Sequence, residues 1–414
     1  MSIPVAKQYI LDFENLGFGM FVHWGLYSSV SKGEYTYYKH GWDKAEYEKL
    51  MESFTAEDFN ADELVLMAKN AGCRYAAFTT RHHDGFSLFD TCGLNEYDSV
   101  HSAAKRDLVK EFVDACNKHG ILPVLYHTTL DWHNEIYKRN FKEYLEYHRK
   151  SVELLCKNYG KIGGFWFDGN WAKPKADWEE DALYAMIRKY QPEAILINNT
   201  STGARGATGN SELDAVTFEQ GRPTPMNRNG MEKYLAAEMC QTLNQHWGIA
   251  ENDLDYISPK TIIEMLCDCR KVGANFLLNV GPEAQGKINP LQRELFSVAG
   301  KWMSVFGEAI YEGRPHDSYT NGKSFILKSL DSSSLYIFAF DLGSDDTKYN
   351  PATNKYCGGV CFNGVGEKIR SIRWMDSGEE LDFMQGKNML AVNFTGYPYG
   401  TNFCVRVAKA EIDK

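Results

Sequence analysis

A repeated unit organises the chain from about residue 17 to residue 306: a short apolar segment, a polar or aromatic loop, and then an amphipathic helix. The apolar segments have the length and composition of buried strands, and the helical stretches carry apolar residues three and four positions apart. Strands that alternate with helices form a mostly parallel sheet, because parallel strands need a crossover connection. Seven or eight such units over about 300 residues favour an α/β fold closed into a (β/α)8-like TIM barrel.

The sequence places each expected element at a definite position. Strands are expected at residues 18–22, 74–80, 121–126, 163–167, 194–198, 215–218 and 274–280. Helices are expected at residues 62–70, 105–118, 141–158, 259–271 and 290–306.

The pattern changes after Gly313-Arg314-Pro315, where short β-rich segments separated by turn residues replace the helices. Strands are expected at residues 325–327, 335–340, 360–362, 369–374, 389–394 and 403–407. Short strands at this spacing without helical periodicity are typical of a small β-sandwich. We therefore predict two domains, a catalytic barrel over residues 1–313 and a sandwich over residues 314–414.

Composition and charge narrow the possible partners. Hydrophobic residues make up 43% of the chain, and the net charge of −10 argues against nucleic acid or an anionic membrane surface as a partner. No apolar segment reaches the roughly 20 residues that span a bilayer. The N-terminus lacks a signal-peptide pattern, so a cytoplasmic location is expected, and the ten scattered cysteines are expected to be reduced. A neutral ligand fits this composition best.

Chemistry-bearing side chains gather directly after the expected strands. They are His23, His82, His83, His127, Asp168 and Glu219. A single histidine in such a place is commonly structural, and Asp168-Gly169 alone is a turn signal. A barrel, however, brings the carboxyl ends of all its strands to one mouth, so these groups are expected to share a site.

Two chemistries fit these side chains. A metal-dependent hydrolase would use the histidines and Asp168 as ligands. Against it, His82 and His83 are adjacent, and neighbours on an extended backbone point to opposite sides. We therefore predict no metal and no other cofactor.

The second chemistry is carbohydrate hydrolysis, since sugars pack their C–H faces on aromatic rings and exchange hydrogen bonds with neutral histidine. Aromatic residues near the site are Trp24, Tyr35, Tyr37, Trp132, Trp166, Trp171 and Trp247. Glycoside hydrolysis needs two carboxyl groups. Asp168 is one, and the candidates for the other are Glu219 first, then Glu238 and Glu212.

Several motifs, in order, resemble glycoside hydrolase family 29, the α-L-fucosidases. The family's F-G-M-F-x-H-W-G stands at residues 18–25, its H-H-D-G-F at 82–86, its R-D-L-V at 106–109 and its W-F-D-G at 166–169. The E-x-C…W-G stretch stands at residues 238–248, and G-x-N-x-L-L-N-x-G-P at residues 273–282. The similarity extends over about residues 17–313.

The resemblance implies a barrel followed by a β-sandwich, and a retaining exo-hydrolase of terminal α-L-fucose on oligosaccharides or glycoconjugates. By motif, Asp168 is the nucleophile and Glu219 stands where the acid/base is often found, with Glu238 as the second choice. The residues implied in substrate binding are His23, Trp24, Glu34, His82, His83, His127, Trp166, Arg205 and Trp247.

The chain also departs from the family pattern. Asn198-Asn199-Thr200 replaces the frequent N-D-R, so Arg205 is the candidate for the arginine contact. His127 stands where a tyrosine is usual, and Ala237-Glu238 replaces W-E. These changes bear on sugar specificity and linkage preference more than on the chemistry. Two other readings stay open: a hydrolase of a related sugar such as an α-L-galactoside, and a barrel that binds fucose without cleaving it, against which the presence of Asp168 and a plausible acid speaks.

Overall fold

The computed structural model describes residues 2–343, 349–350 and 355–413. By their contacts the residues group into two compact units, Met1–Ile257 with Asn275–Ser297, and Ser258–Ala274 with Val298–Lys414. This grouping places the helix at 259–271 and the end of the helix that starts at Pro290 with the C-terminal strands. The boundary between residues 313 and 314 stays a prediction.

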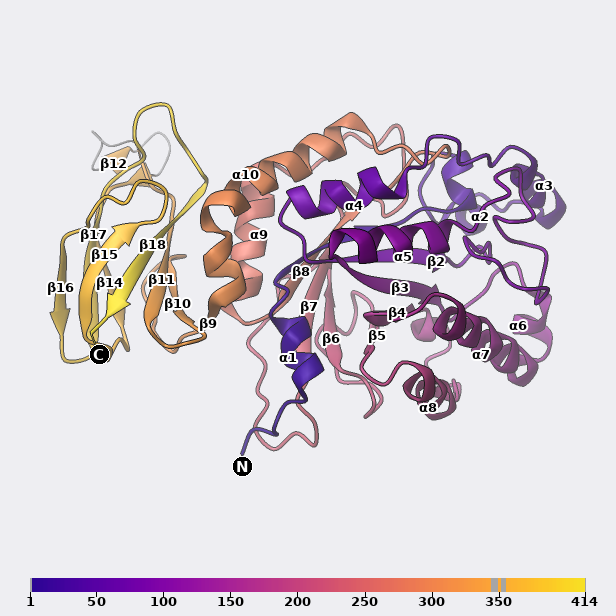
Figure 1. Ribbon diagram of the computed structural model, residues 1–414, viewed down its shortest axis with the longest axis horizontal. Helices are drawn as coiled ribbons and strands as arrows, with labels where there is room; N and C mark the ends of the chain where they lie inside the picture. The colour runs from indigo at the N-terminus through magenta and orange to yellow at the C-terminus, as the bar shows by residue number, and fades with distance from the viewer. Residues whose placement is uncertain (1, 344–348, 351–354, 414) are drawn as a thin grey trace. The chain divides into compact units, whose positions relative to one another are not determined.

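The first unit is built on a closed barrel of eight parallel strands in sequence order, as expected (Figure 1). The strands are β1 (Phe18–Val22), β2 (Tyr75–Arg81), β3 (Leu122–Thr128), β4 (Gly164–Asp168), β5 (Ile195–Asn198), β6 (Ala215–Glu219), β7 (Ala236–Gln241) and β8 (Asn275–Val280). The sequence pattern did not indicate β7, because Ala-Ala-Glu-Met-Cys-Gln lacks the β-branched residues typical of a strand.

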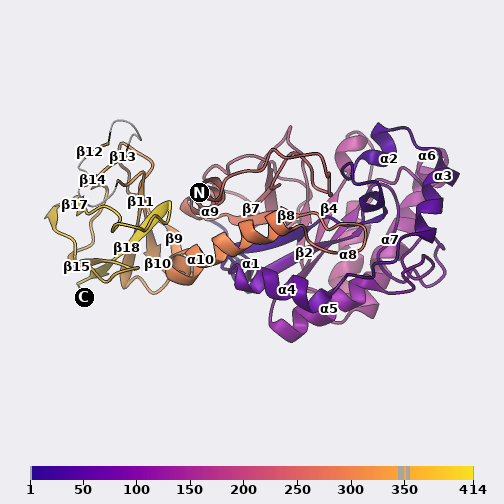
Figure 2. The same ribbon diagram turned by 90° about the horizontal axis from the view of Figure 1, so that it is seen from above.

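Within the first unit, helices lie outside these strands, and α4 and α5 pack side by side in both views (Figure 1, Figure 2). The helices are α1 (Gln8–Glu14), α2 (Thr36–Lys39), α3 (Lys44–Glu48), α4 (Ala61–Asn70), α5 (Leu108–His119), α6 (Glu135–Arg139), α7 (Phe141–Asn158), α8 (Glu180–Tyr190), α9 (Pro259–Lys271) and α10 (Pro290–Glu312). Short 3₁₀ turns are η1 (Leu26–Ser29), η2 (Lys49–Glu52) and η3 (Asn170–Ala172). Within the described residues, no helix is long and apolar enough to cross a membrane.

Local signals set the helix ends. The Asp107 side chain accepts a hydrogen bond from the backbone N–H of Lys110 and so caps the start of α5. Gly120 ends α5 with a φ of 71°, a conformation that glycine adopts without a Cβ clash. The expected limits of α4, α5, α7 and α9 agree with the observed ones to within three residues, whereas α10 continues to Glu312, beyond the expected end at residue 306.

Residues two apart on each barrel strand face the same side. Phe21, Tyr126, Trp166 and Ile197 belong to one buried cluster inside the barrel. Phe78 of β2 instead faces outward and stacks on Phe112 of α5, with ring centroids 4.7 Å apart. This alternation decides which side chains reach the barrel mouth.

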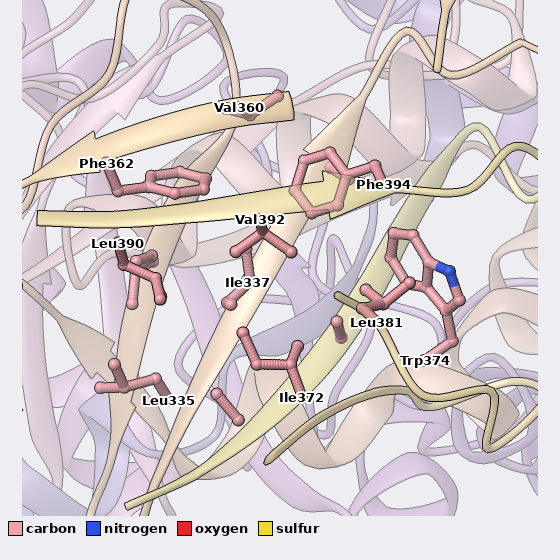
Figure 3. Packing of buried hydrophobic residues seen from close by; sticks show 14 of the residues in the cluster. Leu335, Ile337, Val360, Phe362, Ile372, Trp374, Leu381, Leu390, Val392 and Phe394 are labelled. Carbon is pink, nitrogen blue, oxygen red and sulfur yellow. The ribbon is translucent and has the colours of Figure 1, made fainter. Parts of the chain in front are cut away.

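The second unit contains the expected β-sandwich. A five-stranded antiparallel sheet has the order β15-β18-β11-β10-β9, and a three-stranded one the order β14-β17-β16. Figure 3 shows side chains of both sheets, among them Ile337, Phe362 and Trp374, packed in one core. The strands are β9 (Gly313–Pro315), β10 (Phe325–Ser329), β11 (Ser334–Phe340), β12 (Tyr349–Asn350), β13 (Lys355–Tyr356), β14 (Gly358–Asn363), β15 (Ile369–Trp374), β16 (Phe383–Gly386), β17 (Met389–Phe394) and β18 (Val405–Ile412).

Candidate active site

A pocket of about 300 Å³ lies at the carboxyl ends of the barrel strands. The structure brings six of the predicted site residues to its walls: His23, His82, Trp166, Asp168, Glu219 and Trp247. His23, Asp168 and Glu219 each follow an inward-facing residue by two positions, so the strand alternation delivers them to one place. Trp247 instead comes from the loop after β7, and His82 follows a register shift in the pairing of β2 with β3.

Asp168 ends β4, and side chains from η3 and β3 hold its carboxylate. Trp171 Nε1 donates to Asp168 Oδ1 at 2.8 Å, and the Tyr126 hydroxyl donates to Oδ2 at 3.1 Å. Gly169 follows with a φ of 124°, and a Cβ there would lie 2.8 Å from the backbone nitrogen of Leu130. The Asp-Gly pair therefore forms a glycine-dependent turn that fixes the carboxylate.

The charge of Asp168 is stabilised despite its burial. Burial by itself raises the pKa of this carboxyl, but His83, Trp171 and Asn199 more than offset that effect and hold the pKa below its usual value. Asp168 is thus a buried carboxylate poised in its charged form, as a nucleophile requires.

Glu219 ends β6 and is linked to Asp168 through one amide group. Asn199 Nδ2 lies 2.9 Å from Glu219 Oε2 and 3.2 Å from Asp168 Oδ1. Two oxygens bonded to the same nitrogen are at most about 6 Å apart. This limit suits the separation of about 5–5.5 Å between the two catalytic carboxyl groups of retaining glycosidases better than the wider separation found in inverting ones.

The surroundings of Glu219 favour its protonated form. Burial and then the negative charge of Asp168 raise the pKa of Glu219 to about 7, while the Asn199 hydrogen bond opposes the rise. One carboxyl group is therefore favoured in its charged form, while its neighbour retains its proton up to a pH of about 7. This difference assigns the two groups opposite roles in acid–base chemistry.

His23 presents an acceptor to the pocket because its other nitrogen is committed. Asn279 Nδ2 donates to the Trp247 carbonyl at 2.7 Å, so Asn279 Oδ1 faces His23 Nδ1, which lies 2.7 Å away and must carry the proton. Burial lowers the pKa of His23 to about 3, so the ring is neutral. Nε2 is then free to accept a hydrogen bond from a sugar hydroxyl.

The adjacent histidines His82 and His83 take different places. His82 lines the pocket and stacks on Tyr126, with ring centroids 5.5 Å apart. His83 is fully buried and its Nε2 lies 3.3 Å from Asp168 Oδ2, while its Nδ1 lies 2.7 Å from Thr128 Oγ1. The Thr128 hydroxyl donates to the Leu130 carbonyl, so it accepts from His83 Nδ1. His83 therefore supports the carboxylate of Asp168 and does not line the open pocket.

Trp24 and His127 lie outside the pocket, which corrects their expected role. Trp24 follows His23 by one position and packs against Phe59 on the outer side of the strand, with Nε1 donating to the Glu283 carbonyl. His127 likewise faces outward, with Nε2 3.3 Å from Ser151 Oγ on α7. Tyr126, one residue earlier, lines the pocket in its place.

The side chains of Glu34 and Arg205 form hydrogen bonds with backbone groups of residues near the pocket. Glu34 Oε2 accepts from the backbone N–H groups of Trp247 and Gly248, at 3.0 and 2.9 Å. Arg205 Nε donates to the Glu219 carbonyl at 2.5 Å. Neither residue is among those that line the pocket, so their observed contacts position Trp247 and Glu219.

The other two acid/base candidates are also placed away from the pocket. Glu238 lies deeper in the barrel and accepts from Tyr75 OH at 2.6 Å and from Trp166 Nε1 at 2.9 Å. Burial raises the pKa of Glu238 to about 7. Glu212 is exposed and precedes β6, at the opposite end of the barrel from the pocket. Of the three candidates, Glu219 is the one that lines the pocket with Asp168.

Histidine, cysteine and carboxylate side chains do not form a metal-binding group of three or more within the described part of the chain. The adjacent His82 and His83 diverge: one lines the pocket and the other is directed at Thr128 and Asp168. This is the divergence expected for neighbours on an extended backbone.

The sequence reasoning missed several pocket residues. They are Phe21, Tyr126, Asn199, Ser201 and Thr202. Alternation along β3 and β5 could have indicated Tyr126 and Asn199, because each is two residues beyond an inward-facing neighbour. Ser201 and Thr202 lie in an irregular loop, where no sequence periodicity predicts side-chain direction.

Comparison with known proteins gives the family. A family model described as Alpha-L-fucosidase matches residues 5–308. The tissue α-L-fucosidase of Bos taurus is 29% identical over 330 residues, which cover 73% of this chain and 69% of that protein. The human tissue α-L-fucosidase is 27% identical over 337 residues, which cover 73% of this chain and 69% of that protein.

Solved structures of α-L-fucosidases share the fold of this chain. The α-L-fucosidase isoenzyme 1 from Paenibacillus thiaminolyticus superposes with a TM-score of 0.83 at 28% identity, covering 98% of this chain and 99% of that one. A family 29 α-L-fucosidase from Bacteroides thetaiotaomicron shares the fold, with a TM-score of 0.84 at 21% identity. The superposition covers 100% of this chain and 96% of that one. The chain therefore belongs to the α-L-fucosidases of glycoside hydrolase family 29, as its motifs predicted, and it is a glycoside hydrolase.

Proposed function

We propose that the chain hydrolyses terminal α-L-fucosides with retention of configuration, using Asp168 as nucleophile and Glu219 as acid/base. The observation that carries the proposal is the single amide of Asn199 that bonds both carboxyl groups. It supports the short separation that a retaining mechanism needs.

Each side chain has a defined part in the first step. An Asp168 oxygen attacks the anomeric carbon while the glycosidic C–O bond breaks, and Glu219 gives its proton to the departing oxygen. The sugar is then held by an ester bond to Asp168. The raised pKa of Glu219, about 7, keeps that proton available near neutral pH.

The second step reverses these roles. Glu219, now a carboxylate, takes a proton from water, and the resulting hydroxide attacks the anomeric carbon. The bond to Asp168 breaks and fucose leaves with its original configuration. Two inversions at one carbon account for net retention.

The pocket also supports a terminal sugar as substrate. About 300 Å³ is enclosed by rings that include Phe21, Trp166 and Trp247, with His23 and His82 between them. Aromatic faces pack on sugar C–H groups, and neutral histidine exchanges hydrogen bonds with hydroxyls. An apolar wall suits the methyl group of fucose better than the hydroxymethyl group of an α-L-galactoside, whose hydroxyl would lose its partners.

Hydrolysis of an aryl α-L-fucoside tests the proposal. Wild type should release the phenol, and Asp168→Ala should lose nearly all activity, which azide should partly restore as a fucosyl azide. Asp177→Ala, which alters an exposed carboxylate outside the pocket, is the control. Equal rates for wild type and Asp168→Ala would overturn the nucleophile assignment, and faster cleavage of the matching α-L-galactoside would favour the alternative substrate.

The expected cytoplasmic location stays a proposal, which cell fractionation would test.

A further inference from the structure

His83 lies between two side chains at neighbouring strand ends. Thr128 of β3 and Asp168 of β4 are register partners in the barrel sheet. His83 follows β2, its Nδ1 lies 2.7 Å from Thr128 Oγ1, and its Nε2 lies 3.3 Å from Asp168 Oδ2. Each ring nitrogen therefore faces one polar group, and these two groups determine how many protons the ring carries.

The contact with Thr128 requires a proton on Nδ1. A hydroxyl group has one proton, and Thr128 donates it to the Leu130 carbonyl, an atom that can only accept, at 2.7 Å. The oxygen of Thr128 is therefore an acceptor towards His83. The donor in this contact is Nδ1, which carries the proton of the neutral ring.

The contact with Asp168 requires a second proton, on Nε2. Three side chains donate to the oxygens of Asp168, as they do to an ionised carboxylate, and they are Trp171, Tyr126 and Asn199. Without a proton, Nε2 of His83 would direct its lone pair at this negative charge. Nε2 is buried, and no group among the described residues donates a hydrogen bond to it. A proton on Nε2 converts this repulsion into an ion pair.

The surroundings of His83 strengthen such an ion pair. The side chain is 0% exposed, and a buried cation needs a partner of opposite charge, which Asp168 supplies. Three aromatic rings enclose the imidazole, with centroids 5.6 Å away for Tyr35, 5.1 Å for Trp132 and 5.8 Å for Trp171. These rings exclude water, and the attraction between charges is stronger where water is excluded.

The two other histidines beside His83 are neutral. Burial, and then the charge of His83, holds the pKa of His82 well below its usual value, and the two rings have centroids 4.2 Å apart. Burial lowers the pKa of His23 to about 3. This group of three histidines therefore holds one cation, beside one carboxylate.

We propose that His83 is an imidazolium paired with Asp168, and that its charge accelerates the second step of the reaction. In the first step Asp168 loses its negative charge as it bonds to the anomeric carbon, and the cation stays beside a neutral ester. In the second step the ester C–O bond breaks, its electron pair returns to Asp168, and the negative charge forms again beside His83. A cation that is held where negative charge develops lowers the barrier. His83 is thus a positioning residue that acts through Asp168, and this inference rests on the proposed hydrolysis of fucosides.

Nitrogen-15 NMR of the enzyme labelled in its histidine rings measures the protonation state directly. The signals of His83 are those that are missing from the His83→Gln spectrum. In wild type at neutral pH, both nitrogens should have the chemical shift of a protonated nitrogen. In Thr128→Val, Nδ1 has no acceptor for its proton, so it should have the shift of an unprotonated nitrogen. A neutral ring in wild type would overturn the proposal.

The fluoride substrate separates the two steps. Because fluoride leaves α-L-fucosyl fluoride without help from an acid, kcat/KM reports the first step and kcat the second. In Thr128→Val, kcat should fall at least tenfold and kcat/KM less than threefold. Intact-mass spectrometry of the quenched enzyme should show a larger fraction of fucosyl adduct than in wild type. Thr128→Ser keeps the hydroxyl group and should recover most of the lost kcat.

Thr80→Val is the matched control, because Thr80 is also buried and its hydroxyl contacts His127 on the outer side of the barrel wall. It should lower thermal stability and leave the ratio of kcat to kcat/KM within twofold of wild type. Equal losses of kcat and kcat/KM in Thr128→Val would indicate a purely structural role and overturn the proposal. If wild type cleaves no α-L-fucoside, the proposed hydrolysis itself fails, and the NMR spectrum still decides the charge of His83.

Discussion

Asn199 Nδ2 lies 2.9 Å from Glu219 Oε2, and this contact couples the proposed acid to the nucleophile, since the same nitrogen reaches Asp168. The amide cannot turn freely, because its Oδ1 accepts from the Thr217 hydroxyl at 3.0 Å and from the Ser201 backbone N–H at 3.1 Å. Its donor side is therefore fixed between the two carboxyl groups.

Asn199→Ala should move both limbs of the pH profile upward. The hydrogen bond from Asn199 lowers the pKa of Asp168 and of Glu219, so its loss raises both values. Asp168 acts when charged, so the acid limb moves to higher pH, and Glu219 acts when protonated, so the alkaline limb also moves to higher pH. The profile of kcat/KM for phenyl α-L-fucoside measures both limbs, and we expect a rate loss of roughly tenfold at the optimum.

A purely structural role for Asn199 makes a different prediction. It would lower the rate at every pH without moving either limb. Asn199→Asp is the informative second variant, because it keeps the size of the side chain and adds a negative charge beside both carboxyl groups. It should displace the limbs further than Asn199→Ala does.

Glu219→Gln should remove acid catalysis but leave the pocket intact. For phenyl α-L-fucoside, whose poor leaving group needs a proton, kcat/KM should fall by roughly 10²- to 10⁴-fold. For α-L-fucosyl fluoride it should fall far less, because fluoride leaves without protonation. The alkaline limb, expected near pH 7 from the raised pKa of Glu219, should disappear.

Glu212→Gln is the control for that experiment. Glu212 is exposed at the other end of β6, so both substrates and the alkaline limb should be unaffected. Equal losses for the phenyl and fluoride substrates in Glu219→Gln would mean that Glu219 serves in binding, and the acid would have to be sought elsewhere.

The sequence predicts much of this fold because its signals are local. Asp107 and Gly120 delimit α5, and apolar runs mark seven of the eight barrel strands. Asp168 and Glu219 were predictable because each closes such a run, and a barrel gathers strand ends in one mouth. The seventh strand, with Glu238 inside it, carries no such run.

The sequence motifs do not predict the direction in which each side chain points. His23 and Trp24 are neighbours in one motif, yet one lines the pocket and the other packs outside. The role of Asn199 depends on two carboxyl groups from different strands. A contact of this kind follows from tertiary packing and leaves no mark in the local sequence.

Glu238→Gln should change stability with pH while keeping activity. The folded-state pKa of Glu238, about 7, exceeds the ordinary 4.5, so the folded protein binds a proton more tightly than the unfolded chain. Stability from this group is fully present below pH 4.5 and is lost as the pH rises through about 7, by up to roughly 3 kcal/mol. Urea unfolding at pH 5 and pH 8 should show a smaller difference in the variant than in wild type. Loss of activity as severe as that of Glu219→Gln would identify Glu238 as the acid instead.

His23→Phe and His127→Phe should differ in their effect on fucose binding, since the two rings point to opposite sides of the barrel wall. His23 offers Nε2 to the pocket, so its loss should weaken inhibition by L-fucose and lower kcat/KM roughly tenfold or more. Because the buried Asn279 Oδ1 also loses its donor, His23→Phe should in addition cost about 1–3 kcal/mol of stability. His127 lies between Thr80 and Ser151 in the buried layer under α7. Its replacement leaves the Ser151 hydroxyl without this partner, whereas the Thr80 hydroxyl still donates to the Tyr126 carbonyl, and it should cost about 1–3 kcal/mol of stability. The L-fucose inhibition constant should stay within twofold of wild type. Inhibition and kcat/KM measured beside thermal unfolding test both variants. A His127→Phe enzyme that folds normally but no longer binds fucose would show that the ring contacts the sugar after all.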